Sequence, residues 1–216
     1  MSIFDYLIQT WPSLLRLAGQ HLALVGAAVG CAIICGIPLG VLIVRVRWLA
    51  TPLLSLATVI LTLPSIALFG LMIPIFGHFG HALGYVPAVT AVFLYSLLPI
   101  MRNTYVALAN VDPGIREAAR GIGMTPWQRL RMVELPLATP VIIGGVRTAV
   151  VMNIGVATIS ALIGAGGLGV LILQAISQSN MTKLAIGAVL VSLLAVAADY
   201  CLQWLQRALT PKGVRT

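Results

Sequence analysis

Long apolar segments, separated by short polar intervals, make up most of this chain of 216 residues. A helix needs about 20 apolar residues to cross the hydrocarbon core of a membrane. Five segments reach that length, and the pattern predicts five transmembrane helices, at about residues 21–44, 50–76, 87–108, 137–163 and 182–205. We therefore predict an all-α integral membrane protein in which residues 1–216 form a single domain.

Two shorter apolar segments predict helices that do not span. Residues 3–17 have the pattern of an amphipathic helix that lies at the membrane interface. Residues 169–178 are too few to cross, so they predict an interfacial or re-entrant helix. Pro38 and Pro64 predict kinks in the first two spans, as packing kinks or as bends that face a pore. The first span contains two pairs of glycines four residues apart, Gly26 and Gly30, then Gly36 and Gly40. Such pairs predict that a neighbouring helix approaches the backbone closely.

Composition supports a membrane protein and excludes an ordinary soluble domain. Only 8% of the residues are charged, whereas a soluble domain carries about 25%. The net charge of +8 does not indicate a nucleic-acid partner, because the basic residues lie beside the apolar segments rather than on one soluble face. They follow the first, third and fifth spans, as Arg45 and Arg47, the four arginines of residues 112–136, and Arg207, Lys212 and Arg215. The positive-inside rule then predicts a bacterial cytoplasmic (inner) membrane protein with its N-terminus outside and its C-terminus in the cytoplasm.

The sequence gives no sign of catalysis. It contains no G-x-x-x-x-G-K-[ST] phosphate loop, so ATP hydrolysis would have to come from a partner chain. It also contains no Ser/His/Asp or Cys/His grouping and no metal-ligand spacing. We interpret the three histidines, His21, His78 and His81, as interfacial residues, and predict that the chain is not an enzyme and binds no metal.

Residues 112–136 form the one long polar interval of the chain, and their pattern predicts two short helices joined by a glycine turn. A helix often begins with Ser, Thr, Asp or Asn at the N-cap followed by proline, and it often ends at a glycine in the left-handed conformation. These signals are Asp112-Pro113 at the first start, Gly123 at the turn, Thr125-Pro126 at the second start and Leu135-Pro136 at the end. The pattern alone is equally consistent with a docking element and with a solvated loop whose charges only set the topology.

A resemblance favours the docking element. Glu117-Ala118-Ala119, three residues, Gly123, nine residues and then Val133-Glu134-Leu135-Pro136 resemble the EAA motif of ATP-binding cassette (ABC) importer permeases, with valine in place of isoleucine as the one departure. The resemblance implies a type I ABC importer permease fold with a cytoplasmic coupling-helix loop. The residues that it assigns to ATPase coupling are Glu117, Ala118, Ala119, Gly123, Leu135 and Pro136.

Further stretches, at residues 61–77, 111–124 and 154–169, resemble the osmoprotectant branch of these permeases, which imports glycine betaine, choline, carnitine and related compounds. The resemblance implies three protein partners. These are a cytoplasmic ATPase that carries ATP and Mg, a second permease (identical or paralogous), and an extracytoplasmic solute-binding protein. Methionine importer permeases share the five-span plan and remain the alternative, and a stand-alone secondary transporter or a scaffold without transport is a more distant one.

Charged residues inside spans are costly and are therefore candidates for function. Arg147 lies within the fourth span and Asp199 within the fifth, so we predict that Arg147 faces the dimer interior or pairs with Asp199. The four tryptophans lie near predicted membrane faces or in the polar interval, which leaves no aromatic cage in a pore, and selectivity is assigned to the binding protein. The residues predicted to line the translocation path are Pro64, Ser65, Arg147, Asn153 and Thr158.

Overall fold

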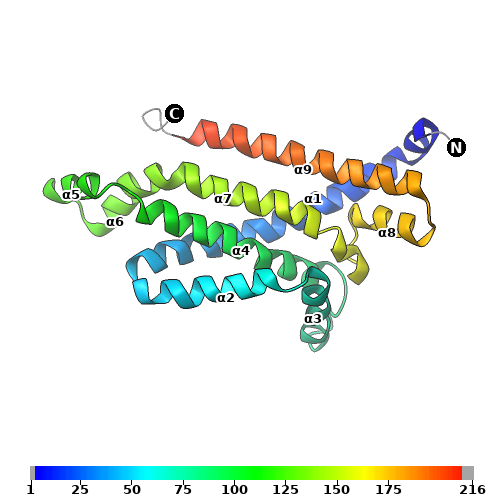
Figure 1. Ribbon diagram of the computed structural model, residues 1–216, viewed down its shortest axis with the longest axis horizontal. Helices are drawn as coiled ribbons and strands as arrows, with labels where there is room; N and C mark the ends of the chain where they lie inside the picture. Colours follow the sequence, from blue (N-terminus) through cyan, green and yellow to red (C-terminus); the bar gives the residue numbers. More distant parts are fainter. Residues whose placement is uncertain (1–2, 211–216) are drawn as a thin grey trace.

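The computed structural model describes residues 3–210, and all regular structure in that part of the chain is helical. Four long helices, α1 (Ile3–Arg45), α4 (Tyr85–Ala109), α7 (Leu135–Val156) and α9 (Met181–Leu209), run along the long axis of the molecule (Figure 1). The shorter elements are η1 (Arg47–Leu49), α2 (Ala50–Thr62), α3 (Ser65–Gly77), α5 (Pro113–Gly121), α6 (Pro126–Arg129), η2 (Leu130–Glu134), η3 (Ile159–Ile163) and α8 (Gly169–Ser177). The predicted all-α fold class is confirmed.

The first helix differs from the prediction, because no separate interfacial helix forms at residues 3–17. α1 is one helix of 43 residues that includes this segment and the first predicted span. Its polar residues at the expected break have partners elsewhere in the fold. His21 Nε2 donates to the Ile154 carbonyl at 2.9 Å, and Gln20 Oε1 accepts from the Gly167 N–H at 3.2 Å. His21 is therefore a buried residue, with 1% of its surface exposed, and its interpretation as interfacial is wrong.

The second predicted span, residues 50–76, is two helices rather than one. α2 and α3 meet at an angle of 103°. Pro64 lacks an N–H and disfavours a helical conformation in the preceding residue, and Leu63 is extended at φ −62° and ψ 135°. The Leu63 carbonyl freed by the break accepts a hydrogen bond from the Tyr95 hydroxyl at 2.6 Å. The kink predicted at Pro64 is thus a sharp bend, and the carbonyl that it frees has a hydrogen-bond partner.

The number of membrane crossings follows from these lengths. Within the described residues four helices are long and apolar enough to cross, and five do so if the bent pair counts as one span. α2 and α3 have 13 residues each, about 20 Å of helix, which is less than the hydrocarbon thickness of about 30 Å. The crossing at residues 50–76 therefore depends on both helices together.

Close backbone contacts join α1 and α4 at the centre of the bundle. A Cβ atom at Gly40 would lie 2.5 Å from the Thr104 Cβ, and one at Gly36 would lie 3.1 Å from the Ile100 Cγ2. The predicted contact of this glycine pair is confirmed. Gly26 and Gly30 have no atom within 4 Å of such a position, so the close contact predicted for this pair is not present in the described structure.

The segment that follows α7 is compact and rich in glycine. α7, which corresponds to the predicted span 137–163, ends at Val156. The last residues of that predicted span form the 3-10 helix η3. Gly164, Gly166 and Gly167 all have φ near +80°, a conformation that side chains other than glycine rarely adopt. The short helix α8 then forms where residues 169–178 predicted one.

The basic ends of the elements gather at one end of the molecule. Figure 1 shows α5 and α6 at the same end as the C-terminal end of α9, and α8 toward the opposite end. Arg45, at the last turn of α1, lies within 3.5 Å of Glu134 beside α6, which places that end of α1 here as well. Lys212 and Arg215 lie outside the described residues. The orientation relative to the membrane stays a prediction.

Candidate functional site

The polar interval begins with a helix whose start is set by local hydrogen bonds. Asp112 Oδ1 accepts from the backbone N–H groups of Gly114 at 2.7 Å and Ile115 at 3.2 Å, and Pro113 is the first residue of α5. α5 ends at Gly121, and Gly123 turns the chain two residues later, with φ at +82°. The Gly123 N–H donates to the Arg120 carbonyl at 2.9 Å. The predicted cap and glycine turn therefore both occur, for the backbone reasons that predict them.

The second helix of the interval also begins as predicted, but it does not end as predicted. Thr125 and Gln128 form a reciprocal capping box, with Thr125 Oγ1 accepting at 3.3 Å and Gln128 Oε1 accepting at 2.9 Å. α6, η2 and α7 then form one continuous helix from Pro126 to Val156. The expectation that Leu135-Pro136 breaks this helix is wrong.

A π turn explains why the helix continues through Pro136. The Leu135 N–H donates to the Leu130 carbonyl, five residues earlier, as in a π-helix. Such a wider turn relieves the clash between a proline ring and the carbonyl of the preceding turn. Leu135 and Pro136 thus lie half-buried in the first turn of α7.

The outer side of α5 is exposed, small and apolar. Ile115, Ala118 and Ile122 are three and four residues apart, so they share one face of the helix, and all three are exposed. We call these residues the outer face of α5. Glu117 and Gly123 are exposed beside it, whereas Ala119 packs inward with 5% of its surface exposed. Exposed apolar side chains on a polar loop are typical of a surface that a partner covers.

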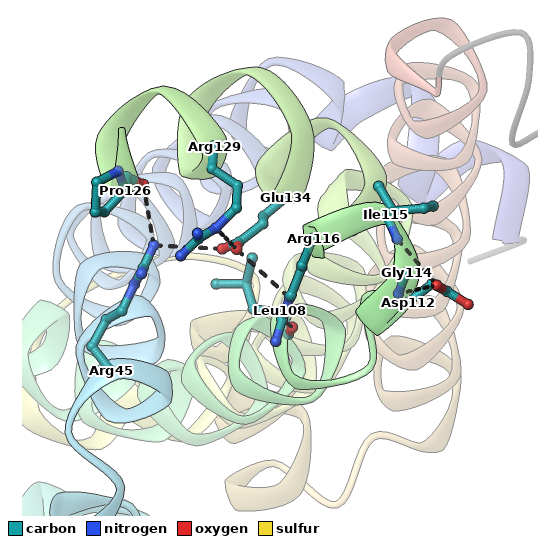
Figure 2. Close-up of polar contacts among 9 residues, drawn as sticks. All are labelled: Arg45, Leu108, Asp112, Gly114, Ile115, Arg116, Pro126, Arg129 and Glu134. Atoms are coloured by element: carbon teal, nitrogen blue, oxygen red, sulfur yellow. Dashed lines mark hydrogen bonds and ion pairs between the residues drawn. The ribbon is translucent and has the colours of Figure 1, made fainter. Parts of the chain in front are cut away.

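A buried carboxylate lies beneath this face. Glu134 in η2 is 3% exposed, and three guanidinium groups surround it (Figure 2). Its Oε1 accepts from Arg129 Nε at 3.0 Å and lies 3.6 Å from Arg116 Nε, and its Oε2 lies 3.5 Å from Arg45 Nη2. We call these four residues the Glu134 cluster.

The arginines of the Glu134 cluster also bind backbone carbonyls. Arg116 donates to the carbonyl of Leu108 in the last turn of α4, and Arg45 Nη2 donates to the Pro126 carbonyl at 3.4 Å (Figure 2). Below lies an apolar layer of α4, η2 and α7 residues, with Leu108, Leu130 and Ile142 buried in it. Sequence reasoning did not predict the Glu134 cluster. The sequence signal that could have indicated it is Glu134 itself. It is an acidic residue between Val133 and Leu135-Pro136, in an interval that carries four arginines.

The intramembrane charges form the predicted pair. Arg147 Nε donates to Asp199 Oδ1 and Arg147 Nη2 to Asp199 Oδ2, both at 2.9 Å. Arg147 Nη1 also donates to Gln206 Oε1 at 3.0 Å. The pair is only partly buried, and it borders an open cavity of about 510 Å³ lined by Gly144, Arg147, Thr148, Val151, Met152 and Asp199.

The other residues predicted to line a path lie in different surroundings. Pro64 is exposed and Ser65 half-buried at the bend between α2 and α3. Thr158 is half-buried, and its hydroxyl donates to the Gly155 carbonyl at 2.7 Å. Asn153 has no exposed surface and donates to Ser96 Oγ at 2.8 Å, between α7 and α4. In this conformation Asn153 therefore faces the interior of the bundle and not a path.

Comparisons with known proteins connect this geometry to transport. Residues 32–212 match the model of the binding-protein-dependent transport system inner membrane component family. The chain is 62% identical, over 100% of both chains, to the osmoprotectant import permease protein OsmW of Salmonella typhimurium. It is 41% identical to the glycine betaine/carnitine/choline transport system permease protein OpuCB of Bacillus subtilis, over 94% of this chain and 91% of that protein.

The fold also matches a solved transporter structure. A chain from the MetNI methionine ABC transporter in an inward-facing conformation superposes with a TM-score of 0.84 at 25% sequence identity. The match covers 94% of this chain and 99% of that chain. The predicted type I importer permease fold is therefore present. Among the described residues, no group of three or more His, Cys, Asp or Glu side chains could hold a metal ion.

Proposed function

The chain belongs to the family of binding-protein-dependent transport system inner membrane components, and we propose that it is the permease through which an ABC importer moves osmoprotectants. The solute class is that of glycine betaine, choline and carnitine. The observation that carries the proposal is the identity of 62%, over the whole length, with an osmoprotectant import permease. ABC permeases are non-catalytic subunits, so this chain provides the path and a partner ATPase provides the energy.

We assign residues 112–136 to the docking of that ATPase. The exposed outer face of α5, between a capped start at Asp112 and a glycine turn at Gly123, supports this assignment. Glu117, Ala118 and Gly123 lie at the exposed surface. We assign a packing role beneath this surface to the other three residues, the buried Ala119 and the half-buried Leu135 and Pro136. ATP and Mg belong to the ATPase, in keeping with the missing phosphate loop in this sequence.

The mechanism that we propose is alternating access in a permease dimer. The second copy, identical or paralogous, covers faces that this chain leaves open, such as the surface at Gly26 and Gly30. The end of the molecule that carries α5 and α6 lies in the cytoplasm, and the N-terminal end receives solute from an extracytoplasmic binding protein. When the ATPases close, the docked loops approach one another and the cavity between the permeases opens outward.

Within this scheme Pro64, Ser65, Arg147 and Thr158 line the path. The cavity beside Arg147 and Asp199 supports the assignment of Arg147. Asn153 reaches the path only when α7 moves relative to α4, because its side chain now donates to Ser96 across that contact.

Uptake by the reconstituted complex tests the proposal. The permease, its ATPase and its binding protein are placed in proteoliposomes, and uptake of radiolabelled glycine betaine, choline, carnitine and methionine is measured with ATP inside. We expect uptake of at least one osmoprotectant and none of methionine. Preferred uptake of methionine would assign the chain to the alternative solute class, and equal uptake without ATP would contradict an ABC importer.

A further inference from the structure

We propose that Glu134 is the positioning residue that passes ATPase-driven movement of residues 112–136 to the core helices of the permease. Its carboxylate, at the base of α7, contacts arginines from the end of α1 and from α5, and the α5 arginine also bonds to the end of α4. This inference rests on the proposed docking of the ATPase at the outer face of α5. It goes beyond that docking, because it assigns the transmission of movement to a residue that contacts neither ATPase nor solute.

The first argument is convergence. Glu134 itself lies at the base of α7, Arg45 is in the last turn of α1, and Arg116 comes from α5. Arg116 also donates to the Leu108 carbonyl in the last turn of α4. The carboxylate therefore connects α5 to α1 and α7, and Arg116 adds a direct bond to α4, as Figure 2 shows for the side chains involved.

The second argument is that α5 has little other attachment to the bundle. Of its residues only Ala119 is buried. The half-buried Arg116 side chain bridges α5 to Leu108 and Glu134. A load applied to the outer face of α5 must therefore reach the bundle through Arg116, Ala119 and the two chain connections of the loop. Of these, Arg116 is the side chain that touches both α4 and the base of α7.

The third argument comes from charge. Three guanidinium groups surround one carboxylate, which leaves two positive charges in excess. Glu134 and Arg129 are buried, whereas Arg116 is half-buried and Arg45 is exposed. Apolar side chains of similar size would hold a static contact at least as well as a buried ion network. An ion cluster differs from apolar packing in that one carboxylate can exchange partners when the elements around it shift, so the contact persists through a movement.

The distances divide the cluster into a fixed and an exchangeable part. Arg129 and Glu134 lie on the same continuous helix and are hydrogen-bonded at 3.0 Å, so they move together. The contacts of Glu134 to Arg116 at 3.6 Å and Arg45 at 3.5 Å are longer than hydrogen bonds and cross to other elements. Arg116 Nε is buried without a hydrogen-bond partner in this conformation. A small shift of α5 toward Glu134 would complete that bond.

The test uses the complete transporter in proteoliposomes and the variant Glu134→Gln, which keeps the size of the side chain and removes its charge. Three quantities are measured: ATPase retained on the purified permease, ATP hydrolysis, and solute imported per ATP hydrolysed. We expect the ATPase to stay bound, and the solute imported per ATP to fall about tenfold, within the range of ordinary coupling between sites. Glu134→Asp retains the charge and should recover much of the loss.

Arg131→Gln is the matched control, because Arg131 is an exposed arginine of the same π turn and is not part of the Glu134 cluster. It should leave the solute imported per ATP unchanged. The proposal is overturned if Glu134→Gln keeps the wild-type ratio, if it releases the ATPase from the permease, or if Arg131→Gln lowers the ratio equally. If the proposed solute class is wrong, the wild-type transporter will not import osmoprotectants. The solute imported per ATP hydrolysed is then measured for all variants with the solute that the wild-type transporter does import.

Discussion

Arg147 and Asp199 face each other between α7 and α9 and share two hydrogen bonds of 2.9 Å. Two-point pairing of this kind fixes the geometry of both side chains. Gln206 extends the contact, since it accepts from Arg147 Nη1 at 3.0 Å and donates to the Pro140 carbonyl at 2.9 Å. α9 is thereby attached to α7 by a polar contact at a depth where unpaired charge is costly.

Replacement of Arg147 by methionine should destabilise the subunit, because it leaves the Asp199 carboxylate without its partner. Breaking a fully buried pair costs about 3–5 kcal/mol. This pair is partly exposed, so we expect about 2 kcal/mol, measured as a lower midpoint of thermal unfolding in detergent.

The double variant Arg147→Met with Asp199→Leu is the control for that experiment. It removes both charges, and an apolar pair of similar volume is often as stable as the ions that it replaces. We therefore expect its midpoint to return most of the way to the wild-type value. A double variant that is less stable than the single variant would show that the charges act separately. An unchanged midpoint for Arg147→Met would remove the pair from the structural argument.

Gly169 is the tightest glycine contact of the segment that follows α7. A Cβ atom there would lie 1.9 Å from the carbonyl oxygen of Thr158, a backbone atom that cannot rotate away. Gly169→Ala should therefore cost about 3 kcal/mol, at the upper end of what overpacking usually costs, and it should lower the amount of folded protein in the membrane. Gly144→Ala in α7 is the control, since its Cβ position has no atom within 4 Å. Equal behaviour of the two variants would contradict the contact.

The hydroxyl of Tyr95 stabilises the bend between α2 and α3. It donates at 2.6 Å to the Leu63 carbonyl, which the break at Pro64 leaves without a helical partner. Tyr95→Phe should cost about 1 kcal/mol, the lower end of the penalty for an unsatisfied polar group, because Leu63 is only half-buried. The cost is read from thermal unfolding. Tyr105→Phe is the control, because Tyr105 packs beside the same bundle and shows no hydrogen bond in the described structure. A larger effect at Tyr105 would count against this account of the bend.

Much of the helix layout was predictable because the membrane demands long apolar segments. Residues 87–108 and 182–205 are close to α4 and α9 as observed. The length rule could not show that α1 continues through residues 3–17, because the partners of its polar residues are distant in sequence. Gln20 bonds to Gly167 in the glycine-rich segment, and His21 bonds to Ile154 near the end of α7. Nor could the length rule show the 103° bend at Pro64. Proline predicts a kink there, but its size depends on the packing of α3 and on Tyr95.

The candidate site was predictable where its contacts are local. Asp112 and Thr125 bond to groups two or three residues away, and such caps can be read directly from sequence. The Glu134 cluster was not predictable, because Arg45 and Arg116 reach it from other elements. The π turn before Pro136 was also missed, since proline alone indicates a break and the wider turn that relieves it has no sequence signal.

Gly123 provides a test of the proposed docking of the ATPase at residues 112–136. Its φ of +82° lies in the left-handed region, and its Cβ position is otherwise open, so the strain of a substitution comes from the backbone alone. A β-branched residue in that region costs about 1–2 kcal/mol. If the loop relieves this strain by changing shape, Gly123→Val should weaken ATPase binding about tenfold, the equivalent of about 1.4 kcal/mol, and lower uptake, while the permease still inserts in the membrane.

Two variants control for side-chain bulk and for backbone conformation. Gly121→Val adds the same side chain two residues earlier, at an exposed site with open space and without a positive φ, so it should reduce ATPase binding less. Gly123→Asn enlarges the side chain but tolerates the left-handed conformation, so it should retain most binding. Binding is measured by titrating the purified ATPase onto permease in nanodiscs. If Gly123→Val binds the ATPase as tightly as wild type, residues 112–136 do not dock through the shape that this turn imposes.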